Sequence, residues 1–181
     1  VAGKDLVLFV SPSHATRTVA RKVRPHLSAD ALLVCASKGI EQGGETMAEV
    51  LVEELGEDAR HRLSFLSGPS FAFEVLERQP TAVVAAAWDH DVAEAVQAAF
   101  AAPFFRVYTS EDVVGVELGG AVKNIIAIAA GAADGLGLGH NARAAIITRG
   151  LAEISRLGAA RGAQPITFMG LAGMGDLVLT C

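Results

Sequence analysis

Short apolar runs alternate with amphipathic helical patterns through residues 1–110, and this alternation limits the folds open to the chain. The runs are rich in Val, Leu and Phe and have the length of buried strands. The segments between them carry apolar residues at spacings of three and four with charges opposite, as amphipathic helices do. The alternation favours an α/β sheet that is parallel at least in part. We expect strands at 6–10, 32–36, 65–67, 81–87 and 105–108, and helices at 14–26, 45–55, 71–76 and 91–101.

The pattern changes after residue 110, where strand-like runs stop and residues rich in Ala, Ile and Leu follow. These predict two long helices, at 111–136 and 141–161, separated by glycines at 135, 137 and 139. We therefore expect a domain boundary near residue 110, with an α/β part before it and an all-helical part after it.

Composition narrows the class of function. A chain of 181 residues that is 51% hydrophobic can build a sizeable core. The net charge of −5 and the single loose basic set argue against a nucleic acid or anionic membrane as partner, and the basic set predicts a solvated helix face. We expect no membrane span, no metal site and no disulfide, and a reducing cytoplasm fits the two cysteines best. The basic set is Arg17, Arg21, Lys22 and Arg24.

Lys123 is a charged residue inside an otherwise apolar helical run, residues 119–130, in a chain with only four lysines. Burial disfavours the ammonium form, so a lysine in such a place can become a proton donor or acceptor near neutral pH. The structural alternatives are a side chain that reaches water or pairs with a carboxylate. The helix alone favours these alternatives over catalysis.

Polar residues follow the expected strands, at the edge of a doubly wound sheet where ligands gather. Ser13 follows the first strand and Lys38 the second, while Gly68 and Ser70 follow the third. Each serine can cap a helix or bind a ligand, and Lys38 can be a solvated loop charge or an anion-binding group. Asp176 comes after the glycine-rich residues 170–175, and it can be a helix N-cap or the partner of a lysine ammonium.

Taken in order, these motifs resemble those of the bacterial NAD(P)-dependent glycerol-3-phosphate dehydrogenases. The resemblance runs from residue 6 to residue 181, and the joint order of its motifs is highly specific. The motifs are Pro12-Ser13-His14-Ala15, Ser37-Lys38-Gly39, Ser67-Gly68-Pro69-Ser70-Phe71-Ala72, Phe105-Arg106-Val107-Tyr108, Gly119-Gly120-Ala121-Val122-Lys123-Asn124, Asn141-Ala142-Arg143 and Gly173-Met174-Gly175-Asp176-Leu177.

The resemblance implies an α/β plus all-α fold, with an incomplete Rossmann-type sheet followed by a helical domain like that of 6-phosphogluconate dehydrogenase. Residues 1–110 would be the C-terminal part of the dinucleotide-binding domain and 111–181 the first part of the substrate domain. The implied reaction is the reversible reduction of dihydroxyacetone phosphate to sn-glycerol 3-phosphate by NADH or NADPH, for glycerophospholipid synthesis. A homodimer is implied as well.

The resemblance also assigns residues to roles. Lys123 matches the catalytic lysine, and Asn124 and Asp176 accompany it as catalytic residues. Besides Lys123 and Asp176, the implied substrate-binding residues are Lys38, Gly68, Ser70 and Thr180, and the implied cofactor-binding residues are Pro12, Ser13, Lys38 and Ala72.

The chain also departs from the family pattern. No G-x-G-x-x-G motif follows a strand, so we expect an internal piece of a longer enzyme that lacks the first cofactor-binding unit, and we expect these residues alone to be inactive. Two alternatives remain: a related β-hydroxyacid or 6-phosphogluconate-type dehydrogenase, or a non-catalytic remnant that serves as a binding or oligomerisation module.

Overall fold

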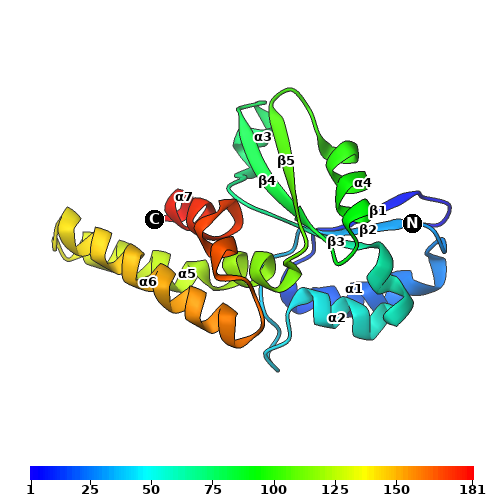
Figure 1. Cartoon of the computed structure of the whole chain (residues 1–181), viewed down its shortest axis with the longest axis horizontal. Coiled ribbons are helices and arrows are strands. Elements are labelled where there is room, and N and C mark those ends of the chain that lie inside the picture. Colours follow the sequence, from blue (N-terminus) through cyan, green and yellow to red (C-terminus); the bar gives the residue numbers. More distant parts are fainter.

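The computed structural model describes residues 1–181 and contains one five-stranded sheet, whose strands lie side by side in chain order (Figure 1). All neighbouring pairs are parallel except β3 and β4, which are antiparallel with Phe65 opposite Ala86. The expectation of a sheet that is parallel at least in part is confirmed. It did not say which strand pair would be antiparallel, and that pair is β3 and β4. The strands are β1 (Leu6–Phe9), β2 (Leu32–Cys35), β3 (Leu63–Ser67), β4 (Thr81–Ala86) and β5 (Phe105–Ser110).

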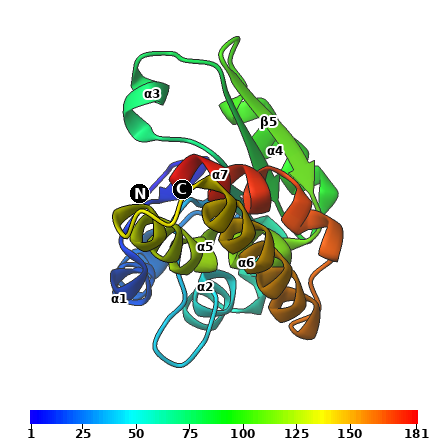
Figure 2. The same ribbon diagram turned by 90° about the vertical axis from the view of Figure 1, so that its left-hand side faces the viewer.

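Helices cover both faces of the sheet. On one face α1 (Ser13–Val23) and α2 (Met47–Leu55) bury Leu33, Cys35 and Phe65, and on the other face α4 (His90–Phe100) covers Val34 and Val83. Alternate residues of β2 thus enter different cores, as the pleat of a doubly covered strand requires. The short α3 (Ala72–Leu76) stands outside both layers, and its large apolar side chains are exposed (Figure 2).

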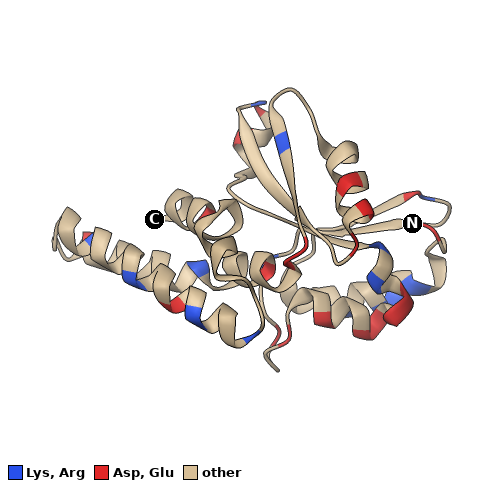
Figure 3. Ribbon diagram, in the orientation of Figure 1, with Lys and Arg blue, Asp and Glu red and all other residues tan.

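The basic set lies on α1 and just after it, and Arg21, Lys22 and Arg24 are exposed, as a solvated face requires, whereas Arg17 is partly buried among carboxylates. The Arg17 guanidinium lies 2.7 Å from Glu41, 2.8 Å from Glu53 and 2.8 Å from Glu54, and Arg21 lies 2.6 Å from Glu54. These acids lie on α2 and in the loop before it, which gives the charged cluster beneath the sheet in Figure 3. The cluster joins α1 to α2, and two neighbouring guanidinium groups lower the pKa of Glu54 to about 2.

The chain after β5 is helical throughout. The long helices α5 (Val113–Gly135) and α6 (His140–Ala160) form a hairpin that extends away from the sheet (Figures 1 and 2). The chain then returns through a 3-10 turn, Pro165–Met169, and a π-helical turn, Leu171–Gly175, to the short helix α7 (Asp176–Thr180). Phe168 and Leu177 are fully buried against Leu118 and Ile154, so the returning segment packs on the hairpin.

Helix α5 begins at a buried carboxylate. Asp112 accepts a hydrogen bond from Gly115 N at 3.0 Å, and its other oxygen accepts from Gln164 N at 2.9 Å and from the Thr167 hydroxyl at 2.6 Å. One side chain therefore caps α5 and also holds the segment that leads to α7. These hydrogen bonds fix the start of α5, which carries Lys123, relative to the segment that leads to Asp176 on α7.

Helix α5 is also long and apolar enough to cross a membrane, by length and composition alone, with a mean hydropathy of 1.6 over 18 residues. We expected no apolar run long enough to span a membrane, because Glu117 and Lys123 interrupt the apolar residues of this helix. Half of that window is buried inside the protein, as in the core helix of a globular domain, so the finding is weak evidence for a span.

Candidate active site

Asp176 stands at the centre of the candidate site and is shared by two lysines. Its Oδ1 lies 2.6 Å from Lys123 Nζ and its Oδ2 lies 2.5 Å from Lys38 Nζ. The residue is 1% exposed. It is the first residue of α7, so the N-cap role considered for it is not observed. A buried carboxylate requires a partner, and here the lysines come from chain positions more than 50 residues away.

Lys123 projects from α5 and is almost buried, with 11% of its side chain exposed. Besides Asp176, its ammonium donates a hydrogen bond to Thr180 Oγ1 at 2.8 Å, and the Thr180 hydroxyl in turn donates to Asp176 O at 2.7 Å. An ammonium has three N–H donors, and these two bonds use two of them. The third is left for a ligand.

Lys38 reaches the same carboxylate from the loop after β2. Its ammonium donates to Gly68 O at 3.0 Å as well as to Asp176, and 29% of its side chain remains exposed. Burial lowers the pKa of Lys38, while the hydrogen bond to Asp176 opposes that change. The site therefore holds two ammonium groups and one carboxylate, a combination that attracts an anion.

Two glycines in α5 allow the elements of the site to meet. A Cβ on Gly119 would lie 2.5 Å from Ala172 O, and a Cβ on Gly120 would lie 2.8 Å from Ser67 Oγ and 3.4 Å from Lys38 Cδ. Separations below 3 Å do not occur for real Cβ atoms. The absence of side chains at these positions therefore lets both the returning loop and the end of β3 touch the helix just before Lys123.

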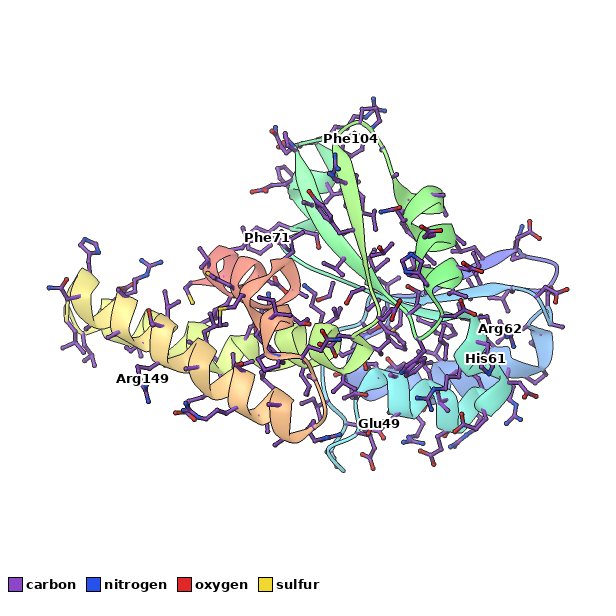
Figure 4. The ribbon with its side chains drawn as sticks, in the orientation of Figure 1. Glu49, His61, Arg62, Phe71, Phe104 and Arg149 are labelled. Carbon is purple, nitrogen blue, oxygen red and sulfur yellow. The ribbon has the colours of Figure 1, made fainter.

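The loop after β3 contributes a backbone carbonyl to the site, and its serine does not cap a helix. Gly68 has φ +135°, a conformation that favours glycine, and its carbonyl accepts hydrogen bonds from Lys38 and, at 3.2 Å, from the Ser70 hydroxyl. The capping role considered for Ser70 is therefore not observed, since Phe71 is the N-cap of α3. Phe71 is exposed in this loop, as Figure 4 shows.

The other residues that the sequence assigned to the site lie outside the lysine–carboxylate cluster. Asn124 follows Lys123 on α5 and is exposed, and Ala72 is exposed on α3. Pro12 is the N-cap of α1, so Ser13 begins the helix and does not cap it. Ser13 lies beside the Lys38 loop, because a Cβ on Gly39 would lie 2.6 Å from the Ser13 side chain.

The sequence reasoning missed Glu117, which lies on α5 six residues before Lys123. Its carboxyl oxygens accept hydrogen bonds from Ala48 N, at 3.0 and 3.2 Å, at the start of α2. Burial raises the pKa of Glu117 to about 8, against the opposing effect of hydrogen bonds from Thr46 and Ala48. The signal was available, because Glu117 is a charged residue among apolar ones just before the run that drew attention to Lys123.

Known proteins resemble this chain in sequence and in fold. A family model described as the N-terminus of NAD-dependent glycerol-3-phosphate dehydrogenase matches residues 1–93, and one described as its C-terminus matches residues 112–181. The chain belongs to the NAD-dependent glycerol-3-phosphate dehydrogenase family. The resemblance stated from the motifs is thereby confirmed.

Curated relatives within this family are named glycerol-3-phosphate dehydrogenases of the NAD(P)+ type. The protein from Syntrophotalea carbinolica is 57% identical over 181 residues, and that from Geobacter metallireducens is 60% identical over 181 residues. Each alignment covers 99% of this chain and 54% of the relative. The chain thus spans about half the length of the glycerol-3-phosphate dehydrogenases that it matches.

Solved glycerol-3-phosphate dehydrogenases have the same fold over almost the whole chain. The Coxiella burnetii structure superposes with a TM-score of 0.92 at 43% identity, covering 99% of this chain and 54% of its own. The structure of GPD1 from Saccharomyces cerevisiae gives 0.85 at 30% identity, covering 98% and 53%. The expected fold class, a Rossmann-type sheet followed by helices, is therefore confirmed.

Proposed function

We propose that the enzyme containing this chain reduces dihydroxyacetone phosphate reversibly to sn-glycerol 3-phosphate, which supplies glycerophospholipid synthesis. The observation that carries the proposal is the Lys123–Asp176–Lys38 cluster, which holds two ammonium groups beyond the ends of β2 and β3 in a member of this family. Such a cluster suits a phosphorylated ketone, because the phosphate needs cationic partners and the carbonyl oxygen needs a proton donor.

Lys123 is the proposed proton donor and acceptor. A bound nicotinamide cofactor supplies the hydride, and the substrate oxygen at C2 then gains negative charge. The unused N–H of Lys123 can stabilise that charge and deliver a proton to the oxygen. Asp176 and Thr180 hold the ammonium in one orientation through the bonds of 2.6 and 2.8 Å. Asn124 is proposed to join the site from the next position on α5.

Lys38 is the proposed anchor for the anionic substrate, together with Gly68, Ser70 and Thr180. Lys38 is more exposed than Lys123, and its link to Asp176 holds it at the edge of the cluster. Opposite charges attract strongly where water is partly excluded. The exposed ammonium therefore suits the phosphate, while the buried ammonium suits the reacting carbonyl.

NAD or NADP is the proposed cofactor, held by Pro12, Ser13, Lys38 and Ala72. The residues fit such a group in one respect: α1 begins at Ser13 with no side-chain cap, so its first N–H groups are free to meet an anionic or polar ligand. Pro12 and Ala72 are exposed as well, so a ligand can reach both.

The remaining proposals concern the whole molecule. We assign residues 1–110 to the dinucleotide-binding domain and 111–181 to the helical substrate domain, which agrees with the end of β5 at Ser110 and the start of α5 at Val113. We also propose that residues 1–181 alone are inactive, and that the enzyme is a cytoplasmic homodimer. Free thiols at Cys35 and Cys181 support a reducing compartment.

Oxidation of NADH and NADPH with dihydroxyacetone phosphate tests the reaction in the full-length enzyme that contains this chain. Lys123→Ala should lower kcat by about two to four orders of magnitude, because it removes the proton donor. Arg149→Ala is a matched control, since Arg149 is an exposed cation on α6 that points into solvent (Figure 4). Turnover only with β-hydroxyacids, or equal rates for the two variants, would contradict the proposal.

A further inference from the structure

A small closed cavity lies behind Lys38, between the ends of β2 and β3 and the first turns of α5. It leaves about 10 Å³ for the centre of a water-sized sphere. One ordered water needs roughly 10–15 Å³ measured in this way. The polar residues of its wall are Ser37, Lys38, Ser67 and Glu117, and Cys35 and Phe65 are among the others.

Ser67 gives this cavity an unmet polar group. It is 6% exposed, and its hydroxyl has no hydrogen-bond partner in the protein. An unpaired buried hydroxyl costs about 1–3 kcal/mol, so such groups usually bind an ordered water. Gly120 of α5 lies against the Ser67 hydroxyl, since a Cβ there would lie 2.8 Å from Ser67 Oγ.

Glu117 supplies a second polar group from the opposite wall. Its two oxygens accept from Ala48 N, at 3.0 and 3.2 Å, and the Thr46 side chain also donates to this carboxyl. A carboxyl group has about four lone-pair positions, so acceptor capacity remains. The neighbouring Cys35 thiol is buried, and that burial raises its pKa to about 12, so the thiol brings no charge to the cavity.

We propose that this cavity binds one water molecule that bridges Ser67 and Glu117. The bridge joins the last residue of β3 to α5, and Gly68, whose carbonyl accepts from Lys38, is the next residue after Ser67. The water therefore sets the distance between this carbonyl and the helix that carries Lys123. Ser67 and Glu117 become positioning residues for Lys38, and neither contacts the substrate.

The first test is a crystal structure of the full-length enzyme at a resolution that shows ordered water. The expected result is a density peak within about 3.2 Å of both Ser67 Oγ and a Glu117 oxygen. An empty cavity, or a direct hydrogen bond between the two side chains, would overturn the proposal. This test does not depend on the substrate, so it stands even if the proposed reaction fails.

The second test is kinetic and rests on the proposed function. Ser67→Ala should raise KM for dihydroxyacetone phosphate about fivefold and leave kcat within about twofold, since it weakens the placement of Lys38 by about one hydrogen bond. Glu117→Gln keeps an oxygen that can hold the water, so its KM should stay within about twofold of the parent enzyme. Ser64→Ala is a matched control, because Ser64 is also a buried, unpartnered serine on β3 but does not line the cavity. Equal effects of Ser64→Ala and Ser67→Ala, or a loss confined to kcat, would contradict the positioning role.

Discussion

Asp176 neutralises charge for two lysines at once, so its own charge matters more than that of a surface acid. Asp176→Asn leaves Lys38 and Lys123 without their shared counter-ion in a buried setting. Breaking a buried pair in this way typically costs about 3–5 kcal/mol. We expect a loss of that size in the free energy of unfolding, measured with urea.

An exposed pair on the helical hairpin provides the control for this prediction. Asp134 lies 3.1 Å from Arg143, with side chains that are 41% and 36% exposed. Solvent screens such pairs, so Asp134→Asn should cost no more than about 1 kcal/mol. A similar loss for the two variants would show that Asp176 is not the buried centre described above.

Glu117 should make stability depend on pH in the opposite sense to an ordinary paired acid. Glutamate has an ordinary pKa of 4.5, which applies in the unfolded chain, whereas burial raises the pKa of Glu117 in the folded protein to about 8. Between these two pH values the unfolded state binds fewer protons, so the free energy of unfolding falls as the pH rises. The fall amounts to about 1.4 kcal/mol for each pH unit within this range.

Glu117→Gln isolates this effect, because glutamine keeps the shape and cannot titrate. The decline in stability between pH 5 and 8 should be smaller in the variant, as followed by urea unfolding at several pH values. The same decline in both proteins would mean that Glu117 titrates normally. Cys35, Thr46 and Glu49 face this carboxyl as well, and all three are present in both proteins.

Residue types alone predicted part of the site. The isolated charge at Lys123 and the glycine-rich approach to Asp176 pointed to a lysine–carboxylate pair, and the structure confirms that contact. The sharing of Asp176 with Lys38 could not be predicted, because it joins positions 138 residues apart through the fold. The capping roles of Ser13 and Ser70 failed because the N-cap of each helix lies one residue away, at Pro12 and Phe71.

At the scale of elements, the contact between α5 and the returning loop depends on the absence of a side chain. Gly119→Ala would place a Cβ 2.5 Å from the backbone oxygen of Ala172, so the loop that carries Asp176 must move. We expect lower stability, by about 1–3 kcal/mol as for other overpacked sites, and weaker activity. Thermal unfolding and kcat measure the two effects.

Gly131 lies on the same helix, and a Cβ there would meet nothing within 4 Å. Gly131→Ala should therefore stabilise the protein by about 0.5–1 kcal/mol, because alanine favours a helix interior. If Gly119→Ala were equally stabilising, the close approach of the loop to α5 would be wrong.

Periodicity located the elements well and their directions less well. The helix expected at 111–136 is observed as α5, Val113–Gly135, and the strand expected at 81–87 is observed as β4, Thr81–Ala86. The reversal of β4 relative to β3 had no local signal, because a continuous apolar run fits a buried strand of either direction. Direction is decided by the connection, here the loop that contains α3.

At the scale of the whole molecule, the α5–α6 hairpin carries more exposed apolar surface than a free domain tolerates. Four of its large apolar side chains are between 58% and 76% exposed, namely Ile125, Ile128, Leu136 and Leu138. Such patches need a covering layer. We expect residues 1–181 alone to bind the dye ANS, to aggregate and to show no turnover.

The full-length enzyme is the comparison for this prediction, because the curated relatives are about twice as long as this chain. It should bind little ANS under the same conditions and remain dispersed in light scattering. Turnover by residues 1–181 alone, or equal dye binding by the two proteins, would contradict the expectation.

The sharing of one carboxylate between two lysines has a consequence for the speed of encounter. Two ammonium groups and one carboxylate leave a surplus of one positive charge at the mouth of the site, in a chain whose net charge is −5. The proposed substrate, a doubly charged phosphate ester, would be repelled by the net negative charge of this chain and attracted near Lys38. Dissolved salt shortens the reach of both forces, with a screening length of about 8 Å at physiological ionic strength. Ionic strength should therefore weaken both the repulsion by the exterior and the attraction at the entrance, and kcat/KM should follow the balance of the two. In Lys38→Met the attraction at the entrance is lost and only the repulsion remains.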